Sequence, residues 1–316
     1  QPSMLDQLTL TGEVSWARLN SGVALFLRDH AAAWEFGAPV SSPAPSSTGA
    51  GEDTRAPNAW RDLITVRHLL THTSGLRPSL PLRQPWTGYD HAIELAVAEQ
   101  PTQKPGAVFR YSDINYILLG EIVRRVSGQP LDVFAREHVF KPLGMKDTGF
   151  TPRPSARIAP TEQVEGEGIL RGVVHDPTAR RMGGVAGHAG LFTTAEDLAK
   201  FARAVLRGEF FPAGMTAVQS PPGVAVRRAG GFDIDSQYAR PRGNFPIGSF
   251  GHTGWTGGFL WIDPASNTFY VVLSNRVHPD GRGSVVALQR DLGRLVSDAV
   301  RERPAAAGLT APTNRY

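Results

Sequence analysis

Most of the chain's apolar positions recur with helical spacing. Near the N-terminus, four of them fall on one helical face, which predicts that residues 1–37 are helical after a short lead-in. These four are Leu19, Val23, Phe26 and Leu27. Periodicity, caps and glycine stops predict further helices over residues 65–71, 91–99, 114–127, 131–139, 195–206 and 284–303. Five apolar residues of the last helix share one stripe, typical of an amphipathic helix: Val285, Leu288, Leu292, Val296 and Val300.

A β-hairpin is the structure expected for residues 259–275. Two apolar runs, 259–262 and 269–273, are rich in β-branched and aromatic residues, and residues 263–267 turn the chain between them. Glycines weaken a strand, and four lie before or at the start of the hairpin: Gly251, Gly254, Gly257 and Gly258. Either a ligand approaches the backbone here, or the glycines form a bulge. Residues 38–59, 151–180 and 209–247 show no periodicity and are expected to be mostly loop.

Composition places the chain among globular proteins. Its 316 residues are 41% hydrophobic and 20% charged, which fits about two domains or one large one. No apolar run approaches the roughly 18 residues that a membrane span needs. The absence of cysteine excludes disulfides, thiolate metal sites and a cysteine nucleophile. The chain opens on Gln1 rather than Met, so we expect that a leader has been removed.

The net charge of +4 does not predict a nucleic-acid partner. It comes mostly from arginine, and the basic residues are scattered along the chain rather than gathered in one segment. We therefore interpret them as solvated surface residues and expect no nucleic-acid binding.

Tyr111 is the first candidate for chemistry, because it sits where a loop enters a helix. A tyrosine there can act as a general base if a nearby cation lowers its pKa. The alternative is a buried tyrosine whose hydroxyl is hydrogen-bonded within the fold.

Two groups of histidines raise the question of a metal. His68 and His72 are four residues apart and share a helix face, as in a zinc pair, but no acidic residue lies between them. Histidines that pack a helix end are the favoured interpretation. A metal hydrolase that uses His175, Asp176 and His188 is a further hypothesis, and it rests on spacing alone. We expect no metal and no cofactor.

Several blocks, in order along the chain, resemble the serine β-lactamase-like superfamily, and its class C β-lactamase and esterase branch most closely. They are residues 64–76 (ITVRHLLTHTSGL), 111–120 (YSDINYILLG), 140–150 (FKPLGMKDTGF), 183–198 and 251–275. The resemblance covers roughly residues 13–300. It implies an α/β (α+β) fold, in which an antiparallel sheet flanked by helices joins a mainly helical domain, with the active site between them.

The resemblance also implies a division of the chain and a compartment. Residues 1–60 would be an incomplete N-terminal part of the α/β domain, 61–210 the helical domain, and 211–316 the rest of the α/β domain. Relatives are often exported, so a periplasmic or secreted location is expected.

The chemistry that the resemblance implies is acyl transfer. In the superfamily a serine of an SxxK motif attacks a carbonyl, while its lysine and the tyrosine of a YxN motif move the proton. Tyr111 matches that tyrosine, and Asp113 stands at the asparagine position. The third motif, a substrate-binding strand whose backbone donates to the oxyanion, is matched by His252, Thr253 and Gly254.

The first motif departs from the pattern, since no Ser-x-x-Lys occurs in this chain. Counting back from Pro39-Val40 through a turn and a helix places Ser15-Trp16-Ala17-Arg18 at the motif. Ser15 is then the nucleophile and Arg18 replaces the lysine. An arginine cannot serve as a base, but its charge would hold Tyr111 as a phenolate. The alternative is that Ser15 is an ordinary residue near a helix start.

A second departure is that only 14 residues precede Ser15, too few for the strands that relatives place there. We therefore expect the N-terminal strands to be missing from the fold, which leaves an open sheet edge. Three explanations compete: a truncated chain, an edge covered by a second chain, or a diverged relative. The predicted function is that of a serine hydrolase acting on a small ester, amide or β-lactam through an acyl-enzyme. The alternative is a non-catalytic member that binds cell-wall-like ligands or a partner.

Overall fold

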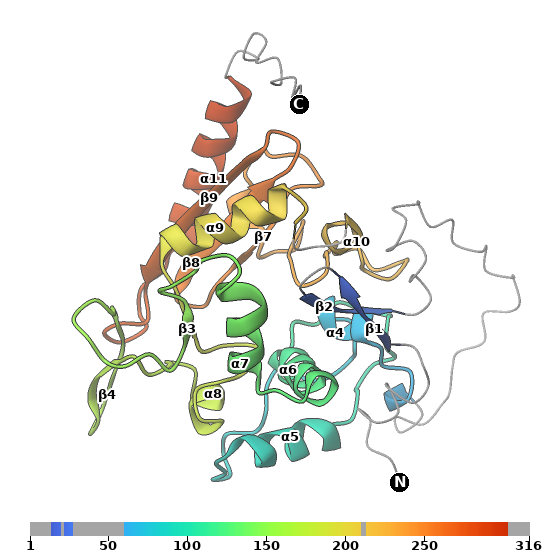
Figure 1. The fold of residues 1–316 in the computed structure, drawn as a ribbon, viewed down its shortest axis with the longest axis vertical. Coiled ribbons are helices and arrows are strands. Elements are labelled where there is room, and N and C mark those ends of the chain that lie inside the picture. Colours follow the sequence, from blue (N-terminus) through green and yellow to red (C-terminus); the bar gives the residue numbers. More distant parts are fainter. Residues whose placement is uncertain (1–13, 20–21, 28–59, 210–212, 303–316) are drawn as a thin grey trace, which may run out of the picture.

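The computed structural model describes residues 14–19, 22–27, 60–209 and 213–302 (Figure 1). In the first two ranges it describes the backbone alone. Strands β1 (Val14–Leu19) and β2 (Gly22–Leu27) pair antiparallel there, from Val14 opposite Leu27 to Leu19 opposite Gly22. The helix expected over residues 1–37 is therefore wrong where the structure describes the chain. A short apolar run such as 22–27 fits a strand as well as a helix face, and periodicity alone does not separate the two.

The mainly helical part surrounds α6 (Asp113–Ser127), which confirms the expected helix and its end at Gly128 in the left-handed conformation. Helices α4 (Val66–Leu70) and α5 (Tyr89–Ala98) pack against α6, as does α7 (Leu131–Ala135), which continues as the π-helix η2 (Arg136–Phe140). The apolar faces of α4, α5 and α6 meet in one core cluster that reaches from Ile64 to Ala186.

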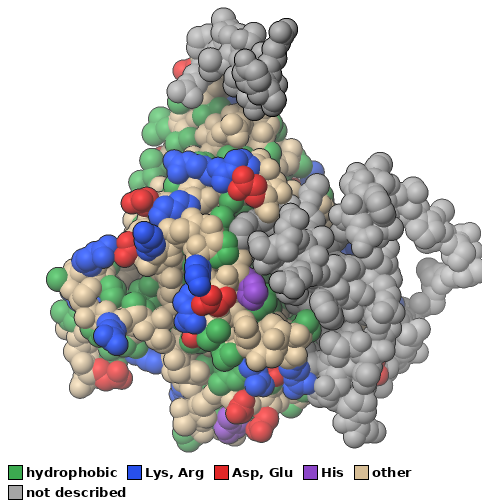
Figure 2. Space-filling model, viewed as in Figure 1, with side chains coloured by type: hydrophobic (Ala, Val, Ile, Leu, Met, Phe, Trp, Pro, Cys, Tyr) green, Lys and Arg blue, Asp and Glu red, His purple; other side chains and the backbone are tan. Residues whose placement is uncertain are grey.

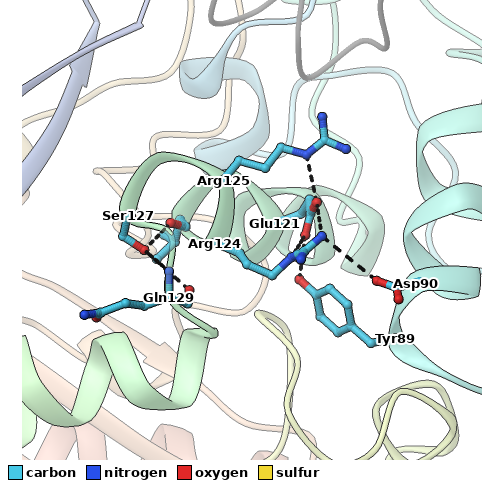
Figure 3. A network of polar contacts seen from close by, with 8 residues as sticks. Tyr89, Asp90, Glu121, Arg124, Arg125, Ser127 and Gln129 are labelled. Atoms are coloured by element: carbon cyan, nitrogen blue, oxygen red, sulfur yellow. Dashed lines mark hydrogen bonds and ion pairs between the residues drawn. The ribbon is translucent and has the colours of Figure 1, made fainter.

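A buried carboxylate joins α5 to α6 (Figure 3). Glu121 of α6 is fully buried, and it accepts hydrogen bonds from the Tyr89 hydroxyl at 3.0 Å and from the Nε atoms of Arg124 at 2.6 Å and Arg125 at 2.8 Å. Burial alone would raise the pKa of Glu121, but the hydrogen bonds from the two arginines and Tyr89 hold it below its usual value. Glu121 is therefore a structural carboxylate of the helical part.

The C-terminal part contains an antiparallel sheet in the order β7 (Phe250–Thr253), β8 (Gly257–Asp263) and β9 (Thr268–Asn275). Strands β8 and β9 confirm the expected hairpin, and a register shift between Gly257 and Phe259 fits the bulge, one of the two alternatives for the glycines. Helix α9 (Ala195–Leu206) lies across the sheet (Figure 1) and shares a second core cluster with it.

Close strand packing, rather than a ligand, accounts for one of the glycines. A Cβ at Gly251 would lie 2.2 Å from the carbonyl oxygen of Leu260 on β8. Only glycine lets β7 approach β8 this closely.

Shorter elements connect the two parts. Strand β3 (Gly149–Phe150) pairs with β6 (Leu191–Phe192). Strand β4 (Pro160–Val164) pairs with β5 (Gly168–Arg171) within residues 151–180, which were expected to be mostly loop. Helix α8 (Pro177–Arg181) follows, with Asp176 as its N-cap. Helix α10 (Ala213–Thr216) and the 3₁₀-helix η3 (Arg240–Arg242) precede the sheet.

The last helix, α11 (Val286–Arg301), packs through an unexpected face. Its buried residues are Gln289, Gly293 and Ser297, which lie one turn apart, while Leu288 and Leu295 are exposed. Gly293 packs on η3, where a Cβ would lie 2.8 Å from the carbonyl oxygen of Pro241. In the apolar stripe predicted from the sequence, Leu288 is exposed, and the other four residues are half-buried beside the packed face: Val285, Leu292, Val296 and Val300.

The structure bears on three expectations about the whole molecule but does not test them fully. The two core clusters lie within residues 64–186 and 202–269, yet the domain boundaries at 60 and 210 are not tested by them. Within the described residues, β9 has no strand on its outer edge, and a second chain covering that edge stays a prediction. None of the described helices has the length and apolar character to cross a membrane.

Figure 2 shows basic side chains in several small groups, interspersed with acidic ones.

Candidate active site

Four aromatic rings from distant parts of the sequence meet in one cluster. The ring of Tyr111, just before α6, stacks on that of His72 with centroids 4.2 Å apart. Its centroid lies 6.2 Å from that of His252 on β7 and 5.4 Å from that of Tyr238. The structure therefore brings the candidate residues Tyr111 and His252 together.

His72 is a fixed, neutral imidazole under this cluster. It follows α4 with a φ of 57°, a conformation that few residues other than glycine adopt, and it is buried. The backbone N–H of Ser112 donates to Nδ1 of His72 at 3.1 Å, so the ring proton is on Nε2. Burial, followed by the charges of Arg228 and His252, holds the pKa of His72 well below its usual value.

His252 is also neutral at pH 7, but its free nitrogen differs. Its Nδ1 lies 2.8 Å from the carbonyl oxygen of Thr253 and so donates a proton to it, which leaves a lone pair on Nε2. Burial and the charge of Arg228 lower the pKa of His252 to about 4. The strand therefore presents an imidazole acceptor beside Tyr111.

Tyr111 itself is a neutral phenol in the resting structure. Burial, followed by the charge of Asp113, raises the pKa of Tyr111, and the charge of Arg228 opposes the rise. A base role for Tyr111 therefore depends on a nearby cation. Among the described residues, Arg228 is a cation whose charge lowers the pKa of Tyr111.

Arg228 is a site residue that the sequence did not reveal. It lies in a stretch without periodicity, and no motif marks it. Its side chain is fully buried, and its guanidinium lies 5.9 Å from the ring centroid of Phe109. Asp233 Oδ2 is 3.8 Å from one terminal nitrogen of Arg228. The guanidinium of Arg228 therefore places a positive charge whose field reaches His72, Tyr111 and His252.

A second polar group joins His188 to the N-cap of α8. Nε2 of His188 is 3.0 Å from Oδ1 of Asp176, and this oxygen also accepts from the backbone N–H of Ala179 at 2.7 Å. The charges of His188 and Asp176 both act on Asp113, whose pKa is raised chiefly by burial. The sequence singled out these three residues, but only Asp113 for this site.

The segment after β7 offers a backbone donor. The N–H of Gly254 donates to the carbonyl oxygen of Gly258 at 2.7 Å, which closes the turn between β7 and β8. The N–H of Trp255 makes no hydrogen bond within the described part of the chain, and its side chain is 70% exposed. Thr253 and Gly254 therefore lead to an N–H, three residues after His252, that has no partner among the described residues.

Ser15 and Arg18 are placed on strand β1, opposite Phe26 and Val23. Their side chains lie outside the described residues. Residues three apart share a face in a helix but not in a strand, so the helical spacing that joined Arg18 to Ser15 does not hold on β1. Ser15 as nucleophile stays a sequence prediction.

In the part of the chain that the structure describes, the histidines outside the aromatic cluster have other roles than metal binding. Nδ1 of His68 accepts from the N–H of Thr65 at 3.2 Å in a capping box, which confirms its structural role at a helix end. Within the described ranges, no group of three or more His, Cys, Asp or Glu residues is arranged to hold a metal ion. The set His175, Asp176 and His188 therefore has no metal geometry.

The chain is similar in sequence to known proteins. The chain is 31% identical over 69% of its length to an N-acetylmuramyl-L-alanine amidase of Bacillus subtilis, and 34% identical over 55% of its length to a putative D-alanyl-D-alanine carboxypeptidase of Escherichia coli O157:H7. These matches cover 57% and 46% of the two relatives, so the chain spans about half of their length.

A solved structure shares the fold. A β-lactamase from Mycobacterium bovis superposes with a TM-score of 0.52 at 27% identity, covering 75% of this chain and 74% of that one. The model of the Beta-lactamase family matches residues 22–294, a range that includes Tyr111, Asp113 and His252 and begins after Arg18. The chain belongs to the β-lactamase family, whose members are serine hydrolases with a β-lactamase/transpeptidase-like fold.

Proposed function

We propose that the cluster of Tyr111 and His252 carries out acyl transfer on a small ester, amide or β-lactam through an acyl-enzyme. One observation carries this proposal: the two motif residues, 141 positions apart, lie with ring centroids 6.2 Å apart in a chain of this family. The names of the similar amidase and carboxypeptidase favour an amide as the bond that is cleaved.

The charge state of each group at the site indicates the role that it would have in the reaction. The neutral phenol of Tyr111 is a proton donor for a leaving group, and Nε2 of His252 is an acceptor beside it. The free N–H of Trp255 would donate to the developing oxyanion. The charge of Arg228 would stabilise any negative charge that develops on Tyr111 during the reaction.

Turnover of a p-nitrophenyl ester tests this proposal. Tyr111→Phe removes the proton donor, and we expect kcat/KM to fall about 100-fold or more. Tyr270→Phe is the matched control. The hydroxyl of Tyr270 donates a hydrogen bond to the carbonyl oxygen of Pro241 beside the sheet, so it has a structural partner outside the candidate site. Equal activity of the two variants would refute the role of Tyr111.

Ser15 enters the proposal as the predicted nucleophile. After incubation with a fluorescent penicillin, peptide mapping locates the acylated residue. An adduct on Ser15 would support the sequence prediction. An adduct on another serine would support acyl transfer and show that this other serine, not Ser15, is the nucleophile.

A second candidate function is non-catalytic ligand binding. It is favoured by Arg18, which stands where the motif lysine is expected, and by the strand that replaces the motif helix. If Arg18 occupies the lysine position in such a member, Arg18→Lys creates turnover where the parent protein has none. If both proteins are inactive, Arg18 does not occupy the lysine position.

A further inference from the structure

We propose that Gln289 of α11 is a positioning residue for the reaction at Tyr111 and His252. Its buried side-chain amide holds two parts of the candidate site: the turn between β7 and β8, and the segment that carries Tyr238. This role rests on the proposed function, because the turn and Tyr238 serve a reaction only if acyl transfer takes place beside them.

Two hydrogen bonds fix the orientation of the Gln289 amide, which is 1% exposed. Nε of Arg240 donates to Oε1 of Gln289 at 2.8 Å, and Nε2 of Gln289 donates to the carbonyl oxygen of Gly257 at 3.1 Å. A guanidinium can only donate and a carbonyl can only accept, so the amide cannot be turned around. Glutamate at this position would lack the donor for Gly257, and lysine would lack the acceptor for Arg240.

The bond to Gly257 holds one end of the turn that offers the Trp255 N–H. The N–H of Gly257 donates to the carbonyl oxygen of Gly254 at 3.0 Å, and that carbonyl shares its planar peptide group with the N–H of Trp255. Nε of Arg276 donates to the carbonyl oxygen of Trp255 at 2.9 Å. Gln289 therefore acts on the direction of the Trp255 N–H through Gly257 and Gly254.

Close packing of α11 against the turn supports the same role. Gly257 has a φ of 103°, and a Cβ there would lie 2.7 Å from Cγ2 of Val285, the N-cap of α11. The turn and the start of α11 therefore meet at Gly257, the residue whose carbonyl Gln289 holds.

The bond to Arg240 reaches the aromatic cluster by a second route. The Arg240 guanidinium also donates from Nη1 to the carbonyl oxygen of Gln237 at 3.2 Å, and it lies 5.9 Å from the ring centroid of Tyr238. The ring of Tyr238 packs edge-on against that of Tyr111, with centroids 5.4 Å apart. Gln289 thus holds the guanidinium that supports the ring beside the candidate proton donor.

Ester turnover by variants of α11 tests this role. Gln289→Leu removes both bonds, and we expect kcat for the p-nitrophenyl ester to fall about tenfold or more, with KM within about threefold of the parent value. Gln289→Glu keeps an acceptor for Arg240 but places a carboxylate at the Gly257 carbonyl, so kcat should fall as well.

Ser297→Ala is the matched control on the same helix. Ser297 is fully buried about two turns further along the packed face, and its hydroxyl accepts from the N–H of Asn244 at 2.9 Å. The substitution removes a buried polar contact of α11 that involves neither the turn nor Arg240. We expect kcat of Ser297→Ala to stay close to the parent value.

NMR gives a readout that does not need turnover. In Gln289→Leu the amide signal of Trp255 and the ring signals of Tyr111 should shift, whereas Ser297→Ala should leave both at their parent positions. Arg240→Met breaks the bond from its other end and takes the place of Gln289→Leu if that variant does not fold. In Arg240→Met, kcat should fall and the ring signals of Tyr111 should shift.

The outcomes separate this role from the proposed function. If the parent chain hydrolyses the ester, three results would overturn the role of Gln289 and leave acyl transfer intact: a parent-like kcat in folded Gln289→Leu, a change in KM alone, or an equal loss of kcat in Ser297→Ala. If the parent chain hydrolyses no ester, acyl transfer fails, and the NMR signals decide whether Gln289 holds the two parts of the site. Unshifted signals of Trp255 and Tyr111 would then overturn its role.

Discussion

The ring of Tyr111 stacks on the ring of His72, with centroids 4.2 Å and planes 29° apart. This contact joins the two motif blocks of the helical part, since His72 ends the segment after α4 and Tyr111 leads into α6. The N–H of Ser112 donates to His72 and fixes its ring. The orientation of Tyr111 is therefore set by an imidazole that is itself held by the backbone.

Arg228 is expected to control the charge state of both site histidines. Its charge lowers the pKa of His72 and of His252, so Arg228→Met should raise both pKa values in an NMR titration. Arg228→Lys keeps a positive charge and should leave them closer to the parent values. Unchanged histidine pKa values in Arg228→Met would show that burial alone sets them.

Stability should fall as the pH drops from about 6.5 to about 4. The pKa of His68 and that of His252 are each lowered from 6.5 to about 4, chiefly by burial. The unfolded chain therefore binds more protons than the folded chain in this window, and full stability is present only above it. Each histidine contributes a slope of up to about 1.4 kcal/mol per pH unit. Chemical denaturation across the window measures it, and His68→Gln should reduce the slope by one histidine's share.

Glu121→Gln should destabilise the helical part. The substitution leaves Arg124 and Arg125 without their buried carboxylate, and we expect the free energy of unfolding to fall by about 2–3 kcal/mol, less than for a fully buried pair because the arginines are partly exposed. Because the pKa of Glu121 is lowered, its contribution is present above the unfolded pKa and is lost in acid. Glu137→Gln, on an exposed ion pair, is the control and should have no measurable effect.

Gly187→Ala should separate the His188 segment from α6. Its Cβ would meet the carbonyl oxygen of Tyr116 at 1.9 Å, and backbone cannot move aside as a flexible side chain does. We expect a loss of about 2–3 kcal/mol in the free energy of unfolding. Gly149→Ala is the control, because nothing lies within 4 Å of a Cβ there. Equal stability of the two variants would contradict the close packing.

The sequence predicted the helices and strands whose ends are marked by capping or turn residues. Thr65 and Thr194 cap α4 and α9, and Gly128 ends α6 in the left-handed conformation, as their residue types indicate. The hairpin of β8 and β9 was predictable from its β-branched runs and its turn. The pairing of Tyr111 with His252 followed from the motif blocks, since no local pattern brings residues so far apart in sequence together.

The failures have tertiary causes. Residues 22–27 are apolar on both faces, so their hydrophobic pattern fits a helical face as well as a strand. On α11, glycine and two polar residues face η3, and small size rather than hydrophobicity selects the packed face. Arg228 carries no local signal, because its importance comes from burial beside Phe109 and Asp233.

Intact-mass spectrometry after incubation with a β-lactam tests the central claim most directly, because it reports the acyl-enzyme itself. The account predicts one covalent adduct per chain, formed about 100-fold more slowly in Tyr111→Phe than in Tyr270→Phe. A folded chain that forms no adduct, or an adduct that forms equally fast in both variants, would contradict acyl transfer at the site of Tyr111 and His252.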